Sequence, residues 1–528
     1  MTQPSIGLPH HPTTWLRRGW RWAAIAVLSL HVACGGGGGG GGGSPPPPQR
    51  SPNVVFILTD DQSMPTLAQM PWVKSLLTDS GTSFERHYVS LSLCCPSRIS
   101  GLRGQYAHNT TIYRNGAPDG GFEAVYQLGL EDSTVATWLQ AAGYRTALFG
   151  KYLNGYPDAA PSANYIPPGW TEFVSPNDGL PYRGFNYSLN DNGRTVVHGE
   201  ADADYLTDVL SAKVIDFIRR SASEHPDQPF FAYVAPYAPH APATPAPRHE
   251  NLFNDAIVPR TGSFNEADVS DKPAWVRALP LLDAAQIDQM DKIYRNRLRS
   301  LQAVDEMVRD IVQALQAQGQ LEHTYIFFAS DNGHHQGQHR MDSGKMTAYE
   351  EDIRVPLIVR GPGVPRGGAV SLITANVDYA PTLAAIAGTS APAFVDGRSL
   401  LPLLQGQTPS PWRQVLLLEH KLDNAADQAL IAQAAARGTL EPPDPFDLTL
   451  GTGPQIASFT GLRTASGLTY VEYDTAEHEL YDNGADPYQL TNTFSTAATD
   501  LKTRLAALTT TLRTAQGAGL RAAEETAP

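Results

Sequence analysis

Long apolar runs, several of them rich in β-branched residues, alternate along this chain with segments of helical periodicity. Three nearly continuous apolar runs are typical of strands buried on both faces, namely residues 52–59, 230–235 and 324–330. Apolar residues recur at the helical period in three other segments, namely residues 134–142, 205–220 and 294–318. Strands that alternate with helices predict a layered α/β/α fold, in which residues 52–59 form a central strand of the sheet.

The pattern changes after about residue 412. Three short strands are predicted there, at residues 415–419, 461–465 and 468–473, and one amphipathic helix at residues 499–516. We therefore expect a main domain over residues 51–411 and a small domain of antiparallel sheet plus helix over residues 412–528. Residues 425–455 are rich in Ala, Pro and Asp, which indicates an insertion or a long loop.

The first fifty residues are typical of an export signal followed by a tether. Basic residues precede a short apolar run at residues 23–30, which suits a signal peptide over residues 1–33. The run ends in His-Val-Ala-Cys34, which resembles a bacterial lipobox, so we expect a lipid on Cys34; the alternative is ordinary cleavage nearby. Glycine and proline tracts then fill a tether over residues 34–50. These features predict an exported lipoprotein, periplasmic or on the cell surface and anchored in the membrane.

Charge and cysteine content exclude some functions. The chain has 528 residues and a net charge of -14, which gives no sign of the basic face of a nucleic-acid-binding protein. An anionic substrate would therefore need a local cluster of Lys, Arg or metal. Three cysteines, two of them the neighbours Cys94 and Cys95, do not make a disulfide framework.

Polar residues follow the predicted strands at the edge where open α/β sheets bind ligands. Asp60 and Asp61 come after the strand at 52–59, Asp331 and Asn332 after the strand at 324–330, and His240 after the strand at 230–235. Taken singly, each is more typical of a turn or a loop. If the two strands lie side by side, however, four side-chain oxygens meet at one point, and such oxygens are the ligands of hard cations.

Residues 94–98 (CCPSR) resemble the C-x-P-S-R motif of the formylglycine-dependent sulfatases, a family of the alkaline-phosphatase-like superfamily. The wider family motif continues to Thr-Gly, where this chain has Arg103-Gly104. Other blocks of the family follow in the same order, at residues 59–62 (TDDQ), 150–154 (GKYLN), 239–240 (PH), 330–333 (SDNG), 344–345 (GK), 396–400 (DGRSL) and 480–482 (LYD). The resemblance is strongest to the N-acetylglucosamine-6-sulfatases, which share CCPSR and GKYLN.

This resemblance implies a fold, a modified residue and a metal. The fold is an α/β/α sandwich around a large mixed sheet, with a smaller C-terminal antiparallel sheet plus helix. A maturase oxidises Cys94 to formylglycine. One Ca²⁺ per chain is held by Asp60, Asp61, Asp331, Asn332 and the formylglycine oxygen.

The resemblance also implies how the remaining site residues act. Lys151 and Lys345 hold sulfate oxygens, Arg98 orients the formylglycine and offsets carboxylate charge, and His240 stands near the leaving oxygen as acid or hydrogen-bond donor. The formylglycine hydrate supplies one hydroxyl to attack sulfur, and its other hydroxyl later expels sulfate by reforming the aldehyde.

One position departs from many sulfatases, which have a histidine where this chain has Leu153. Asn154 is a candidate hydrogen-bond partner for the formylglycine, but the base is not assigned. His334, His335 and His339 form a cluster in the sequence. We expect His335 to line a sugar pocket and His339 to be solvated; a transition-metal site is the alternative.

The favoured substrate is a sulfated carbohydrate of the N-acetylglucosamine-6-sulfate type. The alternatives are an arylsulfatase or phosphonate monoester hydrolase of the same fold, and an inactive protein that binds sulfated glycans through an unmodified Cys94.

Overall fold

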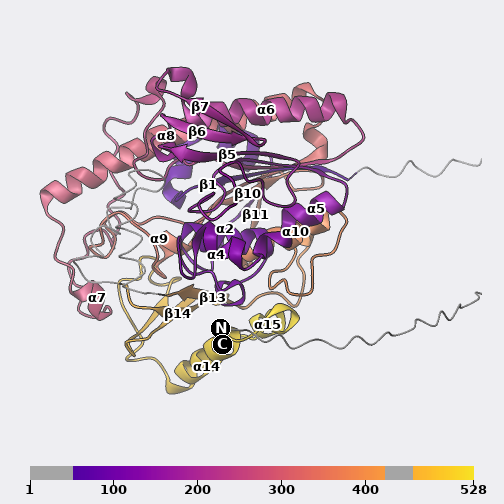
Figure 1. The fold of residues 1–528 in the computed structure, drawn as a ribbon. Coiled ribbons are helices and arrows are strands. Elements are labelled where there is room, and N and C mark those ends of the chain that lie inside the picture. The colour runs from indigo at the N-terminus through magenta and orange to yellow at the C-terminus, as the bar shows by residue number, and fades with distance from the viewer. Residues whose placement is uncertain (1–50, 422–455) are drawn as a thin grey trace, which may run out of the picture. The chain divides into compact units, whose positions relative to one another are not determined.

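Three buried strands lie side by side at the centre of the main sheet in the computed structural model, which describes residues 51–421 and 456–528 (Figure 1). Strand β1 (Asn53–Thr59) pairs in parallel with β8 (Phe230–Ala235) on one side and with β9 (Thr324–Ser330) on the other. Every residue of these three strands is buried, which explains their nearly continuous apolar sequences. The predicted central position of the first strand is confirmed.

The sheet has ten strands in the order β11-β2-β10-β9-β1-β8-β4-β5-β6-β7. Its other strands are β2 (Thr82–Phe84), β4 (Arg145–Gly150), β5 (Glu172–Gly179), β6 (Tyr187–Asp191), β7 (Arg194–His198), β10 (Leu357–Arg360) and β11 (Gly368–Val370). Strands β4, β8, β1 and β9 run parallel, whereas β10, β6 and β7 pair antiparallel with their neighbours. The predicted large mixed sheet is therefore confirmed. Strands β3 (His87–Tyr88) and β12 (Thr374–Ala375) form a separate pair.

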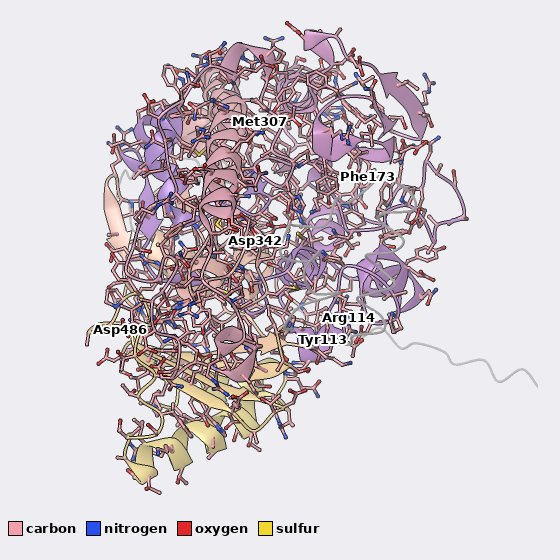
Figure 2. All side chains as sticks on the ribbon, turned by 90° about the vertical axis from the view of Figure 1, so that its left-hand side faces the viewer. Tyr113, Arg114, Phe173, Met307, Asp342 and Asp486 are labelled. Carbon is pink, nitrogen blue, oxygen red and sulfur yellow. The ribbon has the colours of Figure 1, made fainter. Side chains whose placement is uncertain are left out.

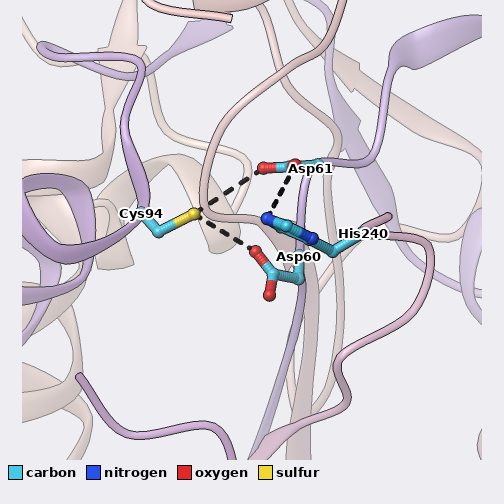
Figure 3. Close-up of side chains that lie close together, drawn as sticks. All are labelled: Asp60, Asp61, Cys94 and His240. Carbon is cyan, nitrogen blue, oxygen red and sulfur yellow. Dashed lines mark hydrogen bonds and ion pairs between the residues drawn. The ribbon is translucent and has the colours of Figure 1, made fainter. Parts of the chain in front are cut away.

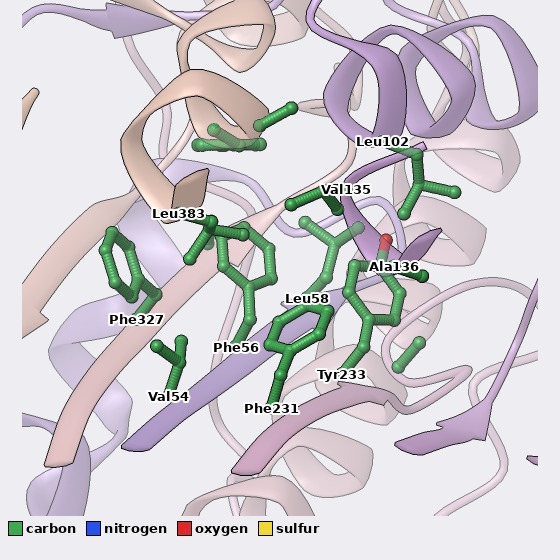
Figure 4. Packing of buried hydrophobic residues seen from close by; sticks show 14 of the residues in the cluster. Val54, Phe56, Leu58, Leu102, Val135, Ala136, Phe231, Tyr233, Phe327 and Leu383 are labelled. Carbon is green, nitrogen blue, oxygen red and sulfur yellow. The ribbon is translucent and has the colours of Figure 1, made fainter. Parts of the chain in front are cut away.

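Alternate residues of β1 point to opposite faces of the sheet, and helices cover both faces. On one face Phe56 and Leu58 share a hydrophobic cluster with residues of α2 (Cys94–Arg103), α5 (Val135–Ala141) and α10 (Tyr379–Ile386) (Figure 4). On the other face, Val55 and Ile57 pack with α6 (Leu206–Glu224) and with Met307 of α8 (Ala284–Ala317) (Figure 2). The predicted α/β/α sandwich is confirmed. The remaining short helices before the C-terminal sheet are α1 (Pro71–Val73), α3 (Ala107–Thr110), α4 (Gly121–Gln127), α7 (Ala274–Arg277), α9 (Glu350–Ile353) and α11 (Leu401–Leu404).

The C-terminal residues form the predicted smaller antiparallel sheet with helices. Its strands are β13 (Val415–His420), β14 (Phe459–Thr464), β15 (Leu468–Tyr473) and β16 (His478–Asp482). The helix predicted at residues 499–516 is confirmed as α14 (Thr499–Leu512), and a second helix that was not predicted, α15 (Gly517–Glu524), follows it. The first helix ends at Leu512, and the chain is extended at Gln516 and left-handed at Gly517, with φ of +53°, where the second helix begins.

All described residues belong to one unit, Arg50–Pro528. The boundary expected near residue 412 stays a prediction. The predicted signal, the lipid on Cys34, the tether over residues 34–50 and the insertion at 425–455 lie outside the described residues. Among the helices that the structure describes, none is long and apolar enough to cross a membrane.

Candidate active site

The register of β1 and β9 brings four polar residues to one edge of the sheet. Thr59 lies opposite Ser330, so the residues that follow them meet. The backbone N–H of Asp61 donates to Asp331 Oδ1 at 3.0 Å, and Asn332 Nδ2 donates to Asp61 Oδ1 at 2.7 Å. Asp60, Asp61, Asp331 and Asn332 are all buried. The juxtaposition expected from the sequence is therefore present.

Helix α2 begins at Cys94 and directs its thiol at these carboxylates. The Sγ atom lies 3.4 Å from Asp60 Oδ1 and 3.7 Å from Asp61 Oδ1 (Figure 3). The neighbouring Cys95 belongs to the hydrophobic cluster between the sheet and helices α2, α5 and α10. Its backbone N–H donates to Asn115 Oδ1 at 2.9 Å. A helix N-terminus also favours negative charge. The first cysteine of the pair therefore faces the polar site, and the second faces the core.

Three cations surround the carboxylates. Lys151 Nζ lies 2.7 Å from Asp60 Oδ2, and Lys345 Nζ lies 2.8 Å from Asp61 Oδ1 and 3.1 Å from the Cys94 sulfur. Arg98, on the second turn of α2, donates from Nε to Asp331 Oδ2 at 2.8 Å and holds the same oxygen with NH2 at 2.8 Å. All three side chains are buried. This acidic protein thus contains the local cationic cluster that an anionic substrate requires.

His240 completes the group from the loop after β8. Its Nε2 lies 3.5 Å from Asp61 Oδ2, and its Nδ1 donates to the carbonyl oxygen of Ala241 at 2.9 Å. Because Nδ1 is held by the backbone, Nε2 is the nitrogen that faces the site (Figure 3).

The pKa values follow from burial and these neighbours. Burial raises the pKa of Asp60, but Lys151, His240 and Arg98 outweigh it and bring that pKa to about 2. Burial raises the pKa of Asp331 to about 6 against the effect of Arg98. Burial also raises the pKa of the Cys94 thiol well above its usual value. An unmodified Cys94 therefore keeps its proton at neutral pH and is a poor nucleophile.

The donor set fits a hard divalent cation. Carboxylate oxygens of Asp60 and Asp61, the Cys94 sulfur and a nitrogen of His240 lie within 4.8 Å of one another. Asn332 adds an amide oxygen, Oδ1, which is buried and has no hydrogen-bond partner among the described residues. A buried amide oxygen without a donor is costly, and a cation would satisfy it. Calcium prefers such oxygen ligands, so the chemistry of the site suits this ion.

The structure brings all the predicted site residues together but adds one that the sequence did not reveal. Arg297 of α8 is buried, donates from NH1 to the carbonyl oxygen of Pro239 at 3.1 Å and contacts the carbonyl oxygen of Asp61 through NH2. It therefore ties the loop before His240 to the strand end. In the sequence it is one of several arginines on a long amphipathic helix, so no local pattern distinguishes it.

The histidine cluster differs from expectation at one position. His339 is fully buried and its Nδ1 lies 2.6 Å from Glu266, so the predicted solvated position is wrong. Its ring stacks on that of Tyr349, with the centroids 4.2 Å apart, which explains its burial. The Nδ1 of His335 lies 2.9 Å from Asp352, and that of His334 lies 4.0 Å from Asp61 Oδ2. Leu153 belongs to the hydrophobic cluster on the α2 side of the sheet.

Comparison with known proteins agrees with this geometry. The model of the sulfatase family matches residues 52–389. The chain belongs to the sulfatase family. Human N-acetylglucosamine-6-sulfatase is 34% identical over 86% of this chain and 82% of its own length. A Caenorhabditis elegans extracellular sulfatase, a Sulf-1 homolog, is 38% identical over 70% of this chain, and the match spans about half, 52%, of that relative.

A solved structure shares the fold of this sulfatase. It holds a protein in complex with its substrate D-glucosamine-2-N,6-O-disulfate, and it superposes with a TM-score of 0.68 at 23% identity, covering 87% of this chain and 97% of the other. The family match and the human relative identify the chain as a sulfuric ester hydrolase.

Proposed function

We propose that this sulfatase removes the 6-O-sulfate of N-acetylglucosamine-type units in sulfated carbohydrates, with a formylglycine made from Cys94 and one calcium ion. The observation that carries the proposal is the position of Cys94, at the start of α2, between two strand-end carboxylates and Lys345. The relatives named N-acetylglucosamine-6-sulfatase and the motif CCPSR support the choice of sugar.

The two groups supply distinct chemistry when present. A hydrated formylglycine offers a hydroxyl that attacks sulfur, and calcium neutralises negative charge beside it. Asp60, Asp61, Asp331 and Asn332 would hold the cation, together with the oxygen at position 94. The other side chains of this site, Lys151, Lys345, Arg98 and His240, carry no oxygen and so leave these four as the oxygen donors.

The chain's own residues then bind and orient the ester. Lys151 and Lys345 place two ammonium groups where sulfate oxygens gather charge, and their burial strengthens that attraction. His240 presents Nε2 to the site, and in its doubly protonated form it donates the Nε2 proton to the departing alcohol oxygen. Arg98 keeps Asp331 in place through two contacts to one carboxylate oxygen.

Kinetics on defined substrates test the proposal. The full chain is co-expressed with a formylglycine-generating maturase, and sulfate release is measured from N-acetylglucosamine-6-sulfate and its oligosaccharides. Turnover that favours the 6-O-sulfate over 2-O- and 4-O-sulfated sugars is expected. Faster turnover of an aryl sulfate or of a phosphonate monoester would instead assign the alternative activities. Binding of sulfated glycan without turnover, by correctly modified protein, would make the chain a glycan-binding protein.

The N-terminal sequence supports export and anchoring as part of the same proposal. A lipid on Cys34 would place the enzyme on a membrane, facing extracellular or periplasmic glycans. Cell fractionation and the mass of the mature N-terminal peptide test this; soluble protein without lipid on Cys34 would contradict it.

A further inference from the structure

Two tyrosines from different loops meet beside the candidate site. Tyr182 lies in a single 3-10 turn, Pro181–Arg183, between β5 and β6, and Tyr237 follows β8. Their ring centroids are 4.7 Å apart with planes at 88°, an edge-to-face contact. Neither residue belongs to a sequence block that pointed to sulfatase chemistry, and the roles proposed above do not use them.

Tyr182 touches both groups that we assign to sulfate and leaving alcohol. The Lys151 Nζ lies 5.1 Å from its ring centroid, within the range of a cation–π contact. The ring of His240 lies 4.7 Å away at 57°. Tyr182 is only 7% exposed, so these contacts enclose it. A rigid ring packed on a lysine and on an imidazole restricts the rotamers of both, which makes Tyr182 a positioning residue.

Tyr237 differs from Tyr182 in its access to solvent. Tyr237 is partly buried, whereas Tyr182 is 7% exposed and Lys151 and His240 are each 2% exposed. Its ring centroid lies 6.0 Å from Lys151 Nζ, and its carbonyl oxygen accepts from the backbone N–H of His240 at 3.0 Å. An ester whose sulfate group binds Lys151 would therefore have this ring within reach of its alcohol part.

A pyranose ring offers what such an aromatic face accepts. Its axial C–H bonds carry small positive charge and its faces are weakly apolar, so they lie well on the electron-rich face of an aromatic ring. We propose that the Tyr182–Tyr237 pair is the subsite for the leaving sugar, with Tyr182 positioning Lys151 and His240 and Tyr237 contacting the sugar ring. The inference rests on the proposed function, and it deepens that function by assigning the residues that recognise the alcohol.

Inorganic sulfate separates the two roles because it fills only the anion part of the site. In Tyr237→Ala we expect the KM for N-acetylglucosamine-6-sulfate to rise about tenfold, the value of one aromatic contact, while the Ki of inorganic sulfate stays at the wild-type value. Tyr237→Trp keeps an aromatic ring at this position, so we expect its KM to stay near the wild-type value. In Tyr182→Leu both constants rise, because Lys151 loses its support, whereas Tyr182→Phe keeps the ring and behaves like wild type.

Phe494→Ala is the matched control. Phe494 also makes a cation–π contact with a lysine, since the Lys502 Nζ lies 4.8 Å from its ring centroid, but it belongs to the C-terminal region. It should leave KM and Ki unchanged. All variants are checked for fold by circular dichroism and for formylglycine by peptide mass. An unchanged KM in Tyr237→Ala, or a Ki for sulfate that rises in parallel, would overturn the inference while leaving the proposed function intact. Failure of the wild-type enzyme to act on any sulfated glucosamine would overturn both.

Discussion

The Lys345 ammonium lies 3.1 Å from the Cys94 sulfur and 2.8 Å from Asp61 Oδ1, although 251 positions of sequence separate the lysine from the cysteine. This contact joins the start of α2 to the loop that follows β9. It places a positive charge beside residue 94, whose proposed formylglycine oxygen would take the place of this sulfur, and beside a candidate metal ligand. A sulfate oxygen bound there would lie close to the Lys345 ammonium and to a cation held by Asp61. Such positive charge is what a site complementary to a sulfuryl-transfer transition state requires.

The first prediction concerns the two adjacent cysteines. Cys94→Ala should reduce kcat by at least about 10³-fold, since it removes the nucleophile. Cys95→Ala should leave kcat within about threefold but lower stability by about 1 kcal/mol, because Cys95 packs in the core. Peptide mass spectrometry should find formylglycine at position 94 only. Fully active enzyme with an unmodified Cys94 would contradict the prediction.

The second prediction separates metal ligation from sulfate binding. Asp331→Ala should lose calcium and reduce kcat/KM by about 10³-fold or more, because it removes a carboxylate from the ligand set. Lys345→Ala should keep calcium and reduce kcat/KM by about 10²-fold. Calcium content by atomic absorption and kinetics on both variants provide the test. Lys74→Ala is the control, since Lys74 is exposed and pairs only with Asp79 among the contacts described. Wild-type calcium in Asp331→Ala would refute the ligand assignment.

Much of this site follows from the sequence because its residues stand at strand ends. Asp60 and Asp331 each follow a buried strand, and parallel pairing of those strands necessarily brings them together. Arg297 and Tyr182 have no such position: one lies within a long helix and the other in a short turn. Their contribution depends on how distant loops pack, which no local pattern encodes. The sequence did not predict α15 for a similar reason, since its first residue, Gly517, is held by Asp396, which lies 121 positions earlier in the chain.

The third prediction tests how α15 is fastened to the body of the enzyme. Glu524 is fully buried, and its Oε2 lies 2.9 Å from Arg413 Nε and 2.8 Å from Arg398 NH2. Arg413 also holds Asp378 at 2.6 Å. Glu524→Ala removes one partner of a buried network and should cost about 3–5 kcal/mol of unfolding free energy.

The next residue provides a control for that measurement. Glu525 contacts Arg398 at 3.1 Å and its side chain is 30% exposed, so Glu525→Ala should cost less than about 1 kcal/mol. Urea unfolding of both variants gives the two numbers. Equal losses would mean that the Glu524 contacts do not fasten the helix.

The last prediction concerns a carboxyl group away from the metal ligands. Glu131, in the turn Leu130–Asp132, accepts from the hydroxyl groups of Tyr152 at 2.8 Å and Tyr165 at 3.3 Å. Burial raises its pKa from the usual 4.5 to about 7, more than the two hydroxyl groups lower it. The folded state therefore binds this proton more tightly than the unfolded state does.

The sign of the pH effect follows directly. Below pH 4.5 the group is protonated in both states and costs nothing; as the pH rises from 4.5 through 7, the folded protein must ionise a buried carboxyl and loses up to about 3 kcal/mol. Glu131→Gln keeps one oxygen that accepts from Tyr152, and its NH2 group can donate to the Tyr165 hydroxyl oxygen instead. Because the amide cannot ionise, the stability of this variant relative to wild type should rise between pH 5 and pH 8. Urea unfolding at both pH values measures this difference. Glu123→Gln, an exposed position on α4, controls for loss of charge in this region. A Glu131→Gln advantage that is the same at pH 5 and pH 8 would show that this carboxyl ionises alike in the folded and unfolded chain.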